Sequence, residues 1–110
     1  MASLVFSIRY DFQVALPRTT SWSLIELAAS GDAVGREEFA RRYDPVVRSV
    51  ICARWKLSRE HADVDDATQE VFVRCFRENG PLARADRQRP QGFRAYLYGI
   101  VRNVTAEAER

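Results

Sequence analysis

The last part of the chain carries the clearest hydrophobic pattern. Its apolar residues recur every three or four positions, as they do on one face of an α-helix. The pattern predicts a helix that starts near Pro90 or Gln91 and runs to the end of the chain. Its apolar stripe comprises Phe93, Tyr96, Leu97, Ile100, Val101 and Val104.

A short helix is predicted to begin at Ser21 or Ser23. Ser23 and Glu26 have the spacing of a capping box, in which each side chain bonds the other's backbone N–H. The pair Gly31-Asp32 favours an end to this helix. We expect its buried face to comprise Leu24, Leu27 and Ala28.

A longer helix should follow, from about Ala33 to Lys56. Pro45 falls inside it, and proline lacks the backbone donor that the helix needs, so a kink or break is expected near Asp44. The apolar stripe of this segment comprises Phe39, Tyr43, Val46, Val47, Val50, Ile51 and Trp55.

The third predicted helix along the chain starts at Ser58 or Asp63 and ends at Glu78, before the breaker residues 79–81. Its apolar positions are Val64, Ala67, Val71, Phe72, Cys75 and Phe76. Together these segments predict an all-α fold, a bundle of three to four helices spanning residues 21–110.

Residues 1–20 follow a different pattern. Apolar and polar residues alternate roughly with a period of two between Val5 and Leu16, and Pro17 ends the run. A single strand without a partner is not stable alone. We therefore expect an extended N-terminal arm that is either packed on a neighbour or disordered.

Charge is distributed unevenly along the chain. The formal net charge is only +2, yet residues 60–73 carry five acids and no Lys or Arg, a net of −5. Residues 74–103 carry seven arginines against two acids, a net of +5. This asymmetry indicates two partners on two surfaces. An arginine-rich composition from a GC-rich genome is an equally simple explanation of the 16 arginines.

Composition argues against several functional classes. No apolar run approaches the ~18 residues of a membrane span, and the N-terminus lacks the features of a signal peptide. Cys52 and Cys75 have no metal-binding spacing and indicate reduced thiols in a cytoplasmic protein. The sequence predicts no enzyme, cofactor or metal.

His61 and the aspartates that follow it form one candidate metal site. His61 precedes Asp63, Asp65 and Asp66, and a small metal-dependent hydrolase could use such groups. On a helix, however, Asp65 and Asp66 point about 100° apart. The sequence offers no second histidine to complete a shell of ligands.

Two helix faces remain as candidate binding surfaces. The third predicted helix presents Asp63, Asp66 and Glu70 opposite its apolar stripe. The last helix presents residues that can bond phosphates and bases or stack on them: Arg94, Tyr98, Arg102, Asn103 and Thr105. Either set could instead be an ordinary solvated face.

Three segments in order resemble a known family. They are residues 28–32 with 38–43, the stretch DVDDATQEVF from Asp63 to Phe72, and FRAYLYGIVRN from Phe93 to Asn103. Together they are similar to region 2 of an extracytoplasmic-function (ECF) sigma factor, a promoter-specificity subunit of bacterial RNA polymerase. The resemblance covers about Ser21 to Arg110.

The resemblance implies two sets of contacts. RNA polymerase core, through the clamp helices of its β′ subunit, would be bound by Asp63, Asp66, Gln69 and Glu70, with Phe72 and Val73 at the edge. The promoter −10 element, as a melted non-template strand, would be bound by Asn103 and by nearby arginines and an aromatic residue. With the loop included, that DNA-binding set is Arg84, Arg87, Arg89, Arg94, Tyr98, Arg102 and Asn103.

The chain also departs from the family. Its loop at residues 81–92 is longer and lacks an aromatic residue, so base-pocket residues are not assigned there. Gly99 stands where the family often has arginine. The family's second domain, region 4, is not in the chain, so we expect weak polymerase binding and no specific initiation alone. The alternative is a sigma-like interaction module that binds polymerase or an anti-sigma factor without opening DNA.

Overall fold

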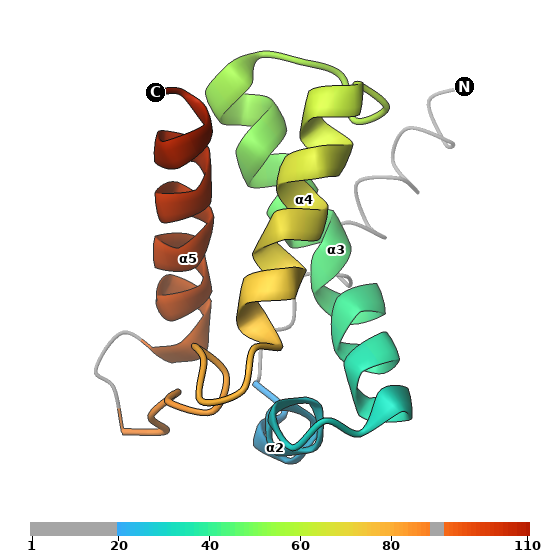
Figure 1. Ribbon diagram of the computed structural model, residues 1–110, viewed down its shortest axis with the longest axis vertical. Coiled ribbons are helices and arrows are strands. Elements are labelled where there is room, and N and C mark those ends of the chain that lie inside the picture. The colour runs from blue at the N-terminus through green and yellow to red at the C-terminus, as the bar shows by residue number, and fades with distance from the viewer. Residues whose placement is uncertain (1–19, 89–91) are drawn as a thin grey trace, which may run out of the picture.

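The computed structural model describes residues 20–88 and 92–110, and these form helices joined by turns. In chain order the helices are α2 (Trp22–Ala29), α3 (Ala33–Trp55), α4 (Ala62–Cys75) and α5 (Gly92–Ala108). The long helices α3, α4 and α5 run alternately up and down the long axis, and α2 lies across their base (Figure 1). The predicted all-α bundle is confirmed. Nearly all of the expected arm at residues 1–20 lies outside the described residues.

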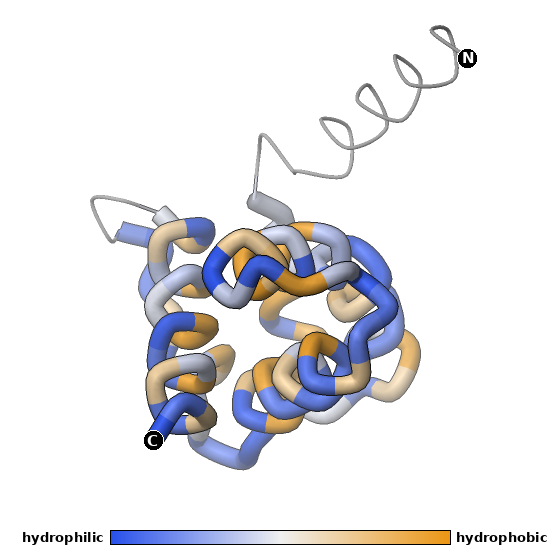
Figure 2. The backbone as a smooth tube through the Cα atoms, turned by 90° about the horizontal axis from the view of Figure 1, so that it is seen from above, coloured by the Kyte–Doolittle hydropathy of each residue, from blue (hydrophilic) through white to orange (hydrophobic). Residues whose placement is uncertain are grey.

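An aromatic cluster forms the centre of the core. The Phe39 ring is fully buried, and its centroid lies 4.7 Å from that of Tyr43, 5.7 Å from Phe76 and 5.9 Å from Phe93. Because these residues come from α3, from the end of α4 and from α5, the cluster joins all three helices. Hydrophobic residues of each helix face the interior of the bundle (Figure 2).

The capping-box prediction for α2 is wrong. Ser21 caps the helix instead, and its hydroxyl accepts a hydrogen bond from the Leu24 N–H at 3.4 Å. The buried residues are Ile25 and Ala28, whereas Leu27 is 49% exposed. A helix of two turns has several possible apolar faces, and the position of α3 decides which one is buried.

A kink or a break was predicted near Asp44; α3 continues through Pro45 from Ala33 to Trp55, so the break does not occur. Proline costs a helix interior about 3 kcal/mol. Burial of Tyr43, Val46 and Val47 on both sides of Pro45 offsets that cost. The helix ends where Lys56 adopts a left-handed conformation with φ of 57°.

The connection from α4 to α5 begins earlier than predicted. α4 ends at Cys75 rather than Glu78, and a turn with Asn79 at φ 55° follows. Leu82 is buried in the core, and the Tyr96 hydroxyl donates a 2.8 Å hydrogen bond to the Pro81 carbonyl. These contacts hold the described part of the loop against α5.

Arg36 fixes the base of the bundle. Its Nε donates to the Ala28 carbonyl at 3.0 Å, and its Nη2 donates to the Phe76 carbonyl at 2.8 Å. The guanidinium also lies over the Phe76 ring, 5.1 Å from its centroid. One side chain on α3 thereby satisfies backbone groups at the ends of both α2 and α4.

Candidate functional site

The outward face of α4 is acidic. His61 caps the helix, and its Nδ1 accepts a hydrogen bond from the Asp63 N–H at 3.0 Å. Val64, Ala67 and Val71 are buried, which turns the predicted contacts Asp63, Asp66, Gln69 and Val73 toward solvent and leaves Glu70 half-buried. Phe72 is 9% exposed and packs against Phe39, so it supports this face from below.

The carboxylates of α4 differ in their hydrogen-bond partners. Asp65 accepts a hydrogen bond from Arg48 of α3, which also donates to Asp44 at 2.9 Å. Glu70 accepts from Arg74. Asp66 has no hydrogen bond or ion pair with any residue that the structure describes, and the Asp63 carboxylate lies 3.9 Å from His61 Nδ1. Asp63 and Asp66 therefore carry the charge that is most available to a partner.

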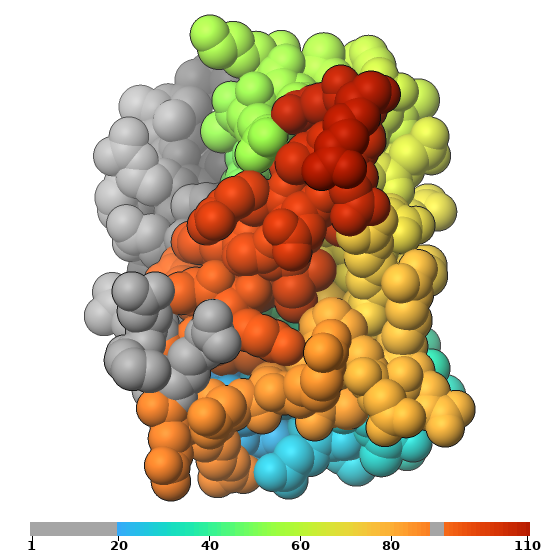
Figure 3. All heavy atoms as spheres, turned by 60° about the vertical axis from the view of Figure 1, so that its left-hand side comes forward, coloured from blue at the N-terminus to red at the C-terminus, as the bar shows by residue number. Residues whose placement is uncertain are grey.

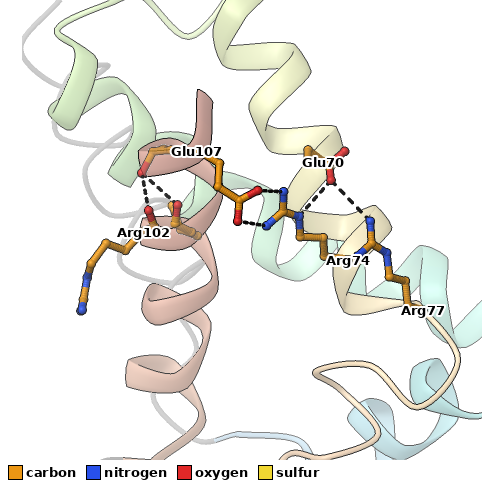
Figure 4. A network of polar contacts seen from close by, with 7 residues as sticks. Glu70, Arg74, Arg77, Arg102 and Glu107 are labelled. Atoms are coloured by element: carbon orange, nitrogen blue, oxygen red, sulfur yellow. Dashed lines mark hydrogen bonds and ion pairs between the residues drawn. The ribbon is translucent and has the colours of Figure 1, made fainter. Parts of the chain in front are cut away.

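A polar network joins α4 to α5 (Figure 4). Arg74 donates through Nε to Glu70 at 2.9 Å and through both Nη atoms to Glu107 at 2.6 and 3.0 Å. These hydrogen bonds raise the pKa of the Arg74 guanidinium and lower the pKa of the Glu107 carboxyl. No sequence pattern indicates this network, because Arg74 and Glu107 lie far apart in the chain.

The outward face of α5 presents the polar residues that the sequence predicted, with one exception. Arg94, Arg102 and Asn103 are exposed and Tyr98 is half-buried. The Arg102 side chain extends away from α4 (Figure 4). The sequence predicts Thr105 on this face, but it is fully buried, and its hydroxyl donates to the carbonyls of Val101 and Arg102, both at 3.0 Å.

The loop arginines are placed differently from one another. Arg84 and Arg87 are exposed, and Arg89 lies outside the described residues. Arg87 donates to Glu26 of α2 at 3.0 Å, and its guanidinium lies 5.8 Å from the Trp22 ring centroid. The loop has no aromatic residue of its own, but α2 brings Trp22 beside it.

Neither a metal centre nor a membrane span is found in the part of the chain that the structure describes. No group of three or more His, Cys, Asp or Glu side chains there could hold a metal ion. No helix there is long and apolar enough to cross a membrane. Burial raises the pKa of the Cys75 thiol to about 12, so this thiol is a poor nucleophile at neutral pH.

Comparison with known families shows which family the chain belongs to. The model of sigma-70 region 2 matches residues 39–108, more than half of the chain. The chain belongs to the sigma-70 region 2 family. The match includes most of α3 and all of α4 and α5, so both candidate faces lie within it. No curated protein and no solved structure matches the chain.

Membership of this family sets the broad function. A sigma region 2 domain is a non-enzymatic domain of a transcription initiation factor, and its family implies interaction with RNA polymerase and promoter DNA. In this region 2 domain, the acidic face lies on α4 and the polar, arginine-bearing face lies on α5. The two faces belong to neighbouring helices of one core and are joined by Arg74.

Proposed function

We propose that this domain belongs to an ECF-type sigma factor of the bacterial cytoplasm. In this proposal α4 binds the β′ clamp helices of RNA polymerase core, and α5 with the preceding loop captures the melted promoter −10 element. The observation that carries the proposal is the exposure of the two faces on adjacent helices. Asp63 and Asp66 point to solvent on α4, and Arg102 and Asn103 do so on α5.

The α4 face suits a cationic protein surface. Asp63, Asp66 and Glu70 can accept charge-assisted hydrogen bonds from arginine or lysine, and these are stronger than bonds between neutral groups. Gln69 adds an exposed amide, and Val73, 55% exposed, adds an apolar contact at the end of the face. Phe72 is proposed to hold this face rigid rather than to form its main contact.

The α5 face suits an unpaired DNA strand. Arg94 and Arg102 can hold backbone phosphates, with Arg84, Arg87 and Arg89 of the loop as further cations. The Tyr98 ring can stack on a base, and Asn103 can bond a base edge. Strand separation is unfavourable, so a protein promotes it by offering an unpaired base contacts that the duplex does not provide.

Binding of single-stranded oligonucleotides to the domain in complex with core polymerase tests the proposal. A panel of fluorescent non-template strands with different −10 sequences should bind the complex. Asn103→Ala should weaken the preferred strand about 5-fold or more, as expected for a lost base contact. Arg102→Ala should weaken all strands and lower the salt slope by about 1, as expected for a lost phosphate contact.

Two variants serve as controls. Arg41→Ala removes an exposed arginine from α3 and should leave strand binding unchanged. Asp66→Arg should abolish association with core, and Glu78→Arg, a charge reversal in the turn after α4, should not. If Asp66→Arg abolishes core association while Asn103→Ala and Arg102→Ala leave strand binding intact, the domain is the alternative module, which binds polymerase or an anti-sigma factor without opening DNA.

A further inference from the structure

The arginines of α3 are paired within the fold, with one exception. Carboxylates or backbone carbonyls accept hydrogen bonds from Arg36, Arg41, Arg48 and Arg54. Arg42 is exposed and has no hydrogen bond or ion pair with any residue that the structure describes. Its charge is therefore available to a group from outside the domain.

Arg42 lies where α3 packs against α5. The next residue, Tyr43, contacts Phe93 across the two helices, with the ring centroids 5.5 Å apart. Arg94 follows Phe93, is exposed, and also lacks a hydrogen bond or ion pair with any described residue. Burial raises the pKa of the Tyr43 hydroxyl, whereas the positive charges of Arg42 and Arg94 both act to lower it. The two guanidinium groups therefore lie near the same hydroxyl.

The Tyr43 hydroxyl is open to the surface, although the residue as a whole is only 3% exposed. The hydroxyl forms no hydrogen bond with a described residue. Within the described ranges, however, the one side-chain oxygen or nitrogen that is fully buried without a partner belongs to Thr68. The Tyr43 hydroxyl must therefore reach solvent at the tip of its ring, where it can donate a hydrogen bond.

Two unpaired arginines beside one phenol suit an anion. Like charges that lie close together repel each other, and α5 supplies no carboxylate before Glu107 to relieve this repulsion. A phosphate relieves it and accepts hydrogen bonds from guanidinium and hydroxyl groups alike. We infer that Arg42, Arg94 and the Tyr43 hydroxyl form a phosphate site between α3 and α5, which holds a backbone phosphate of the captured strand.

The position of the site suits a strand that follows α5. Arg94, Tyr98 and Arg102 are spaced four residues apart, so they form a row along one face of the helix. Figure 3 shows α5 at the surface, above the loop at residues 81–88. Arg42 lies beside the Arg94 end of the row, where the strand would pass onto α3. The inference rests on the proposed function and adds α3, which carries none of the DNA contacts predicted from the sequence.

Arg42→Gln tests the site, because it removes the charge and keeps most of the side-chain length. Fluorescent non-template strands of every −10 sequence should bind the complex of the chain with core polymerase about 3-fold or more weakly, with the salt slope lowered by about 0.7. Arg41→Gln is the matched control, because Arg41 is the adjacent exposed arginine of α3 and is paired with Glu38. It should leave strand affinity unchanged.

Tyr43→Phe tests the hydroxyl separately from the ring. The variant keeps the aromatic packing and should weaken strand binding about 2-fold or more, as expected for one lost hydrogen bond. Its urea midpoint of unfolding should not fall, because the hydroxyl has no partner within the described fold. A lower midpoint with unchanged strand affinity would show that the hydroxyl serves the fold and would overturn its place in the site.

Strands with a single methylphosphonate linkage locate the phosphate, because each replaces one charged phosphate with a neutral group. At one linkage, Arg42→Gln and Arg94→Gln should each lose most of their effect, since the charge that they contact is already absent. Full affinity of Arg42→Gln for the unmodified strand, or the lack of a linkage that couples to both arginines, would overturn the inference.

The outcomes separate this inference from the proposed function. Weaker strand binding in Arg102→Ala and Asn103→Ala but not in Arg42→Gln leaves the proposed function intact and overturns the site on α3. No effect of any of the three overturns both. Free phosphate is the other source of the same chemistry. If inorganic phosphate raises the urea midpoint of the unaltered chain but not of Arg42→Gln, and strand affinity is equal in the two, the site binds a free anion and not the strand.

Discussion

Arg74 on α4 and Glu107 on α5 form a two-point salt bridge, with Nη1–Oε2 3.0 Å and Nη2–Oε1 2.6 Å. The Arg74 side chain is 21% exposed and is held from the other side by Glu70. The pair therefore links a helix proposed to bind polymerase with a helix proposed to bind DNA. Its fixed, paired geometry distinguishes it from a single exposed ion pair, which contributes little to stability.

Removal of either partner should lower stability. We expect Arg74→Ala and Glu107→Gln each to reduce the urea midpoint of unfolding, and the double variant to lose less than the sum of the two. The difference between the summed losses of the two single variants and the loss of the double variant should shrink in high salt. Part of the pair is exposed and is therefore screened. Arg41→Ala, which removes an arginine with 66% side-chain exposure, should change stability by less than about 0.5 kcal/mol. Strict additivity of the two single variants would contradict coupling across the helices.

Two glycines should respond in opposite ways to alanine. A Cβ at Gly35 would lie 2.8 Å from Leu27 Cβ and 3.2 Å from the Ala28 backbone nitrogen, so Gly35→Ala forces α2 and α3 apart. A Cβ at Gly99 meets nothing within 4 Å, so Gly99→Ala should stabilise α5 by about 0.5–1 kcal/mol. Urea denaturation of the two variants measures both effects. A gain in stability from Gly35→Ala would contradict the close packing of α2 on α3.

The long helices could be predicted because their apolar periodicity directly reflects burial. Val64, Val71, Leu97 and Val101, all in predicted stripes, are buried in the structure. The face of α2 could not be predicted, because two turns of helix allow more than one apolar face. Continuity through Pro45 depends on packing with other helices, which local rules do not include.

The exposure and contacts of the candidate site residues could be predicted only in part, because some of those contacts depend on tertiary packing. Exposure of Asp66, Arg102 and Asn103 follows from their helical positions relative to the apolar stripes. Contacts such as Arg87 with Glu26, Arg74 with Glu107 and Trp55 with Glu109 join distant parts of the chain. They become visible only when the helices are assembled.

The aromatic cluster should dominate the stability of the core. Phe39 is fully buried and contacts four other aromatic rings, so Phe39→Ala should cost about 3–5 kcal/mol of unfolding free energy. Val34→Ala removes apolar atoms from the same helix at a residue that is 72% exposed and should cost less than about 0.5 kcal/mol. Chemical denaturation of the two variants provides the comparison. Equal losses would mean that the ring of Phe39 is not at the centre of the core.

The dependence of stability on pH in the acidic range should involve Glu109. Hydrogen bonds from Arg54 and Trp55 lower the pKa of this carboxyl to about 2. An unfolded glutamate has a pKa of about 4.3, so the unfolded chain binds the proton first as pH falls. The stabilising contribution is fully present above about pH 4.3 and is lost as pH falls toward the folded pKa. Urea midpoints measured from about pH 6 to pH 2 should therefore fall less steeply below pH 4.3 in Glu109→Gln than in the unaltered chain.

Glu78→Gln is the control, because it removes a carboxylate that has no hydrogen bond or ion pair to any described residue. It should leave the dependence of the urea midpoint on pH unchanged. Parallel curves for Glu109→Gln and the unaltered chain would show that the Arg54–Glu109 pair is absent in solution.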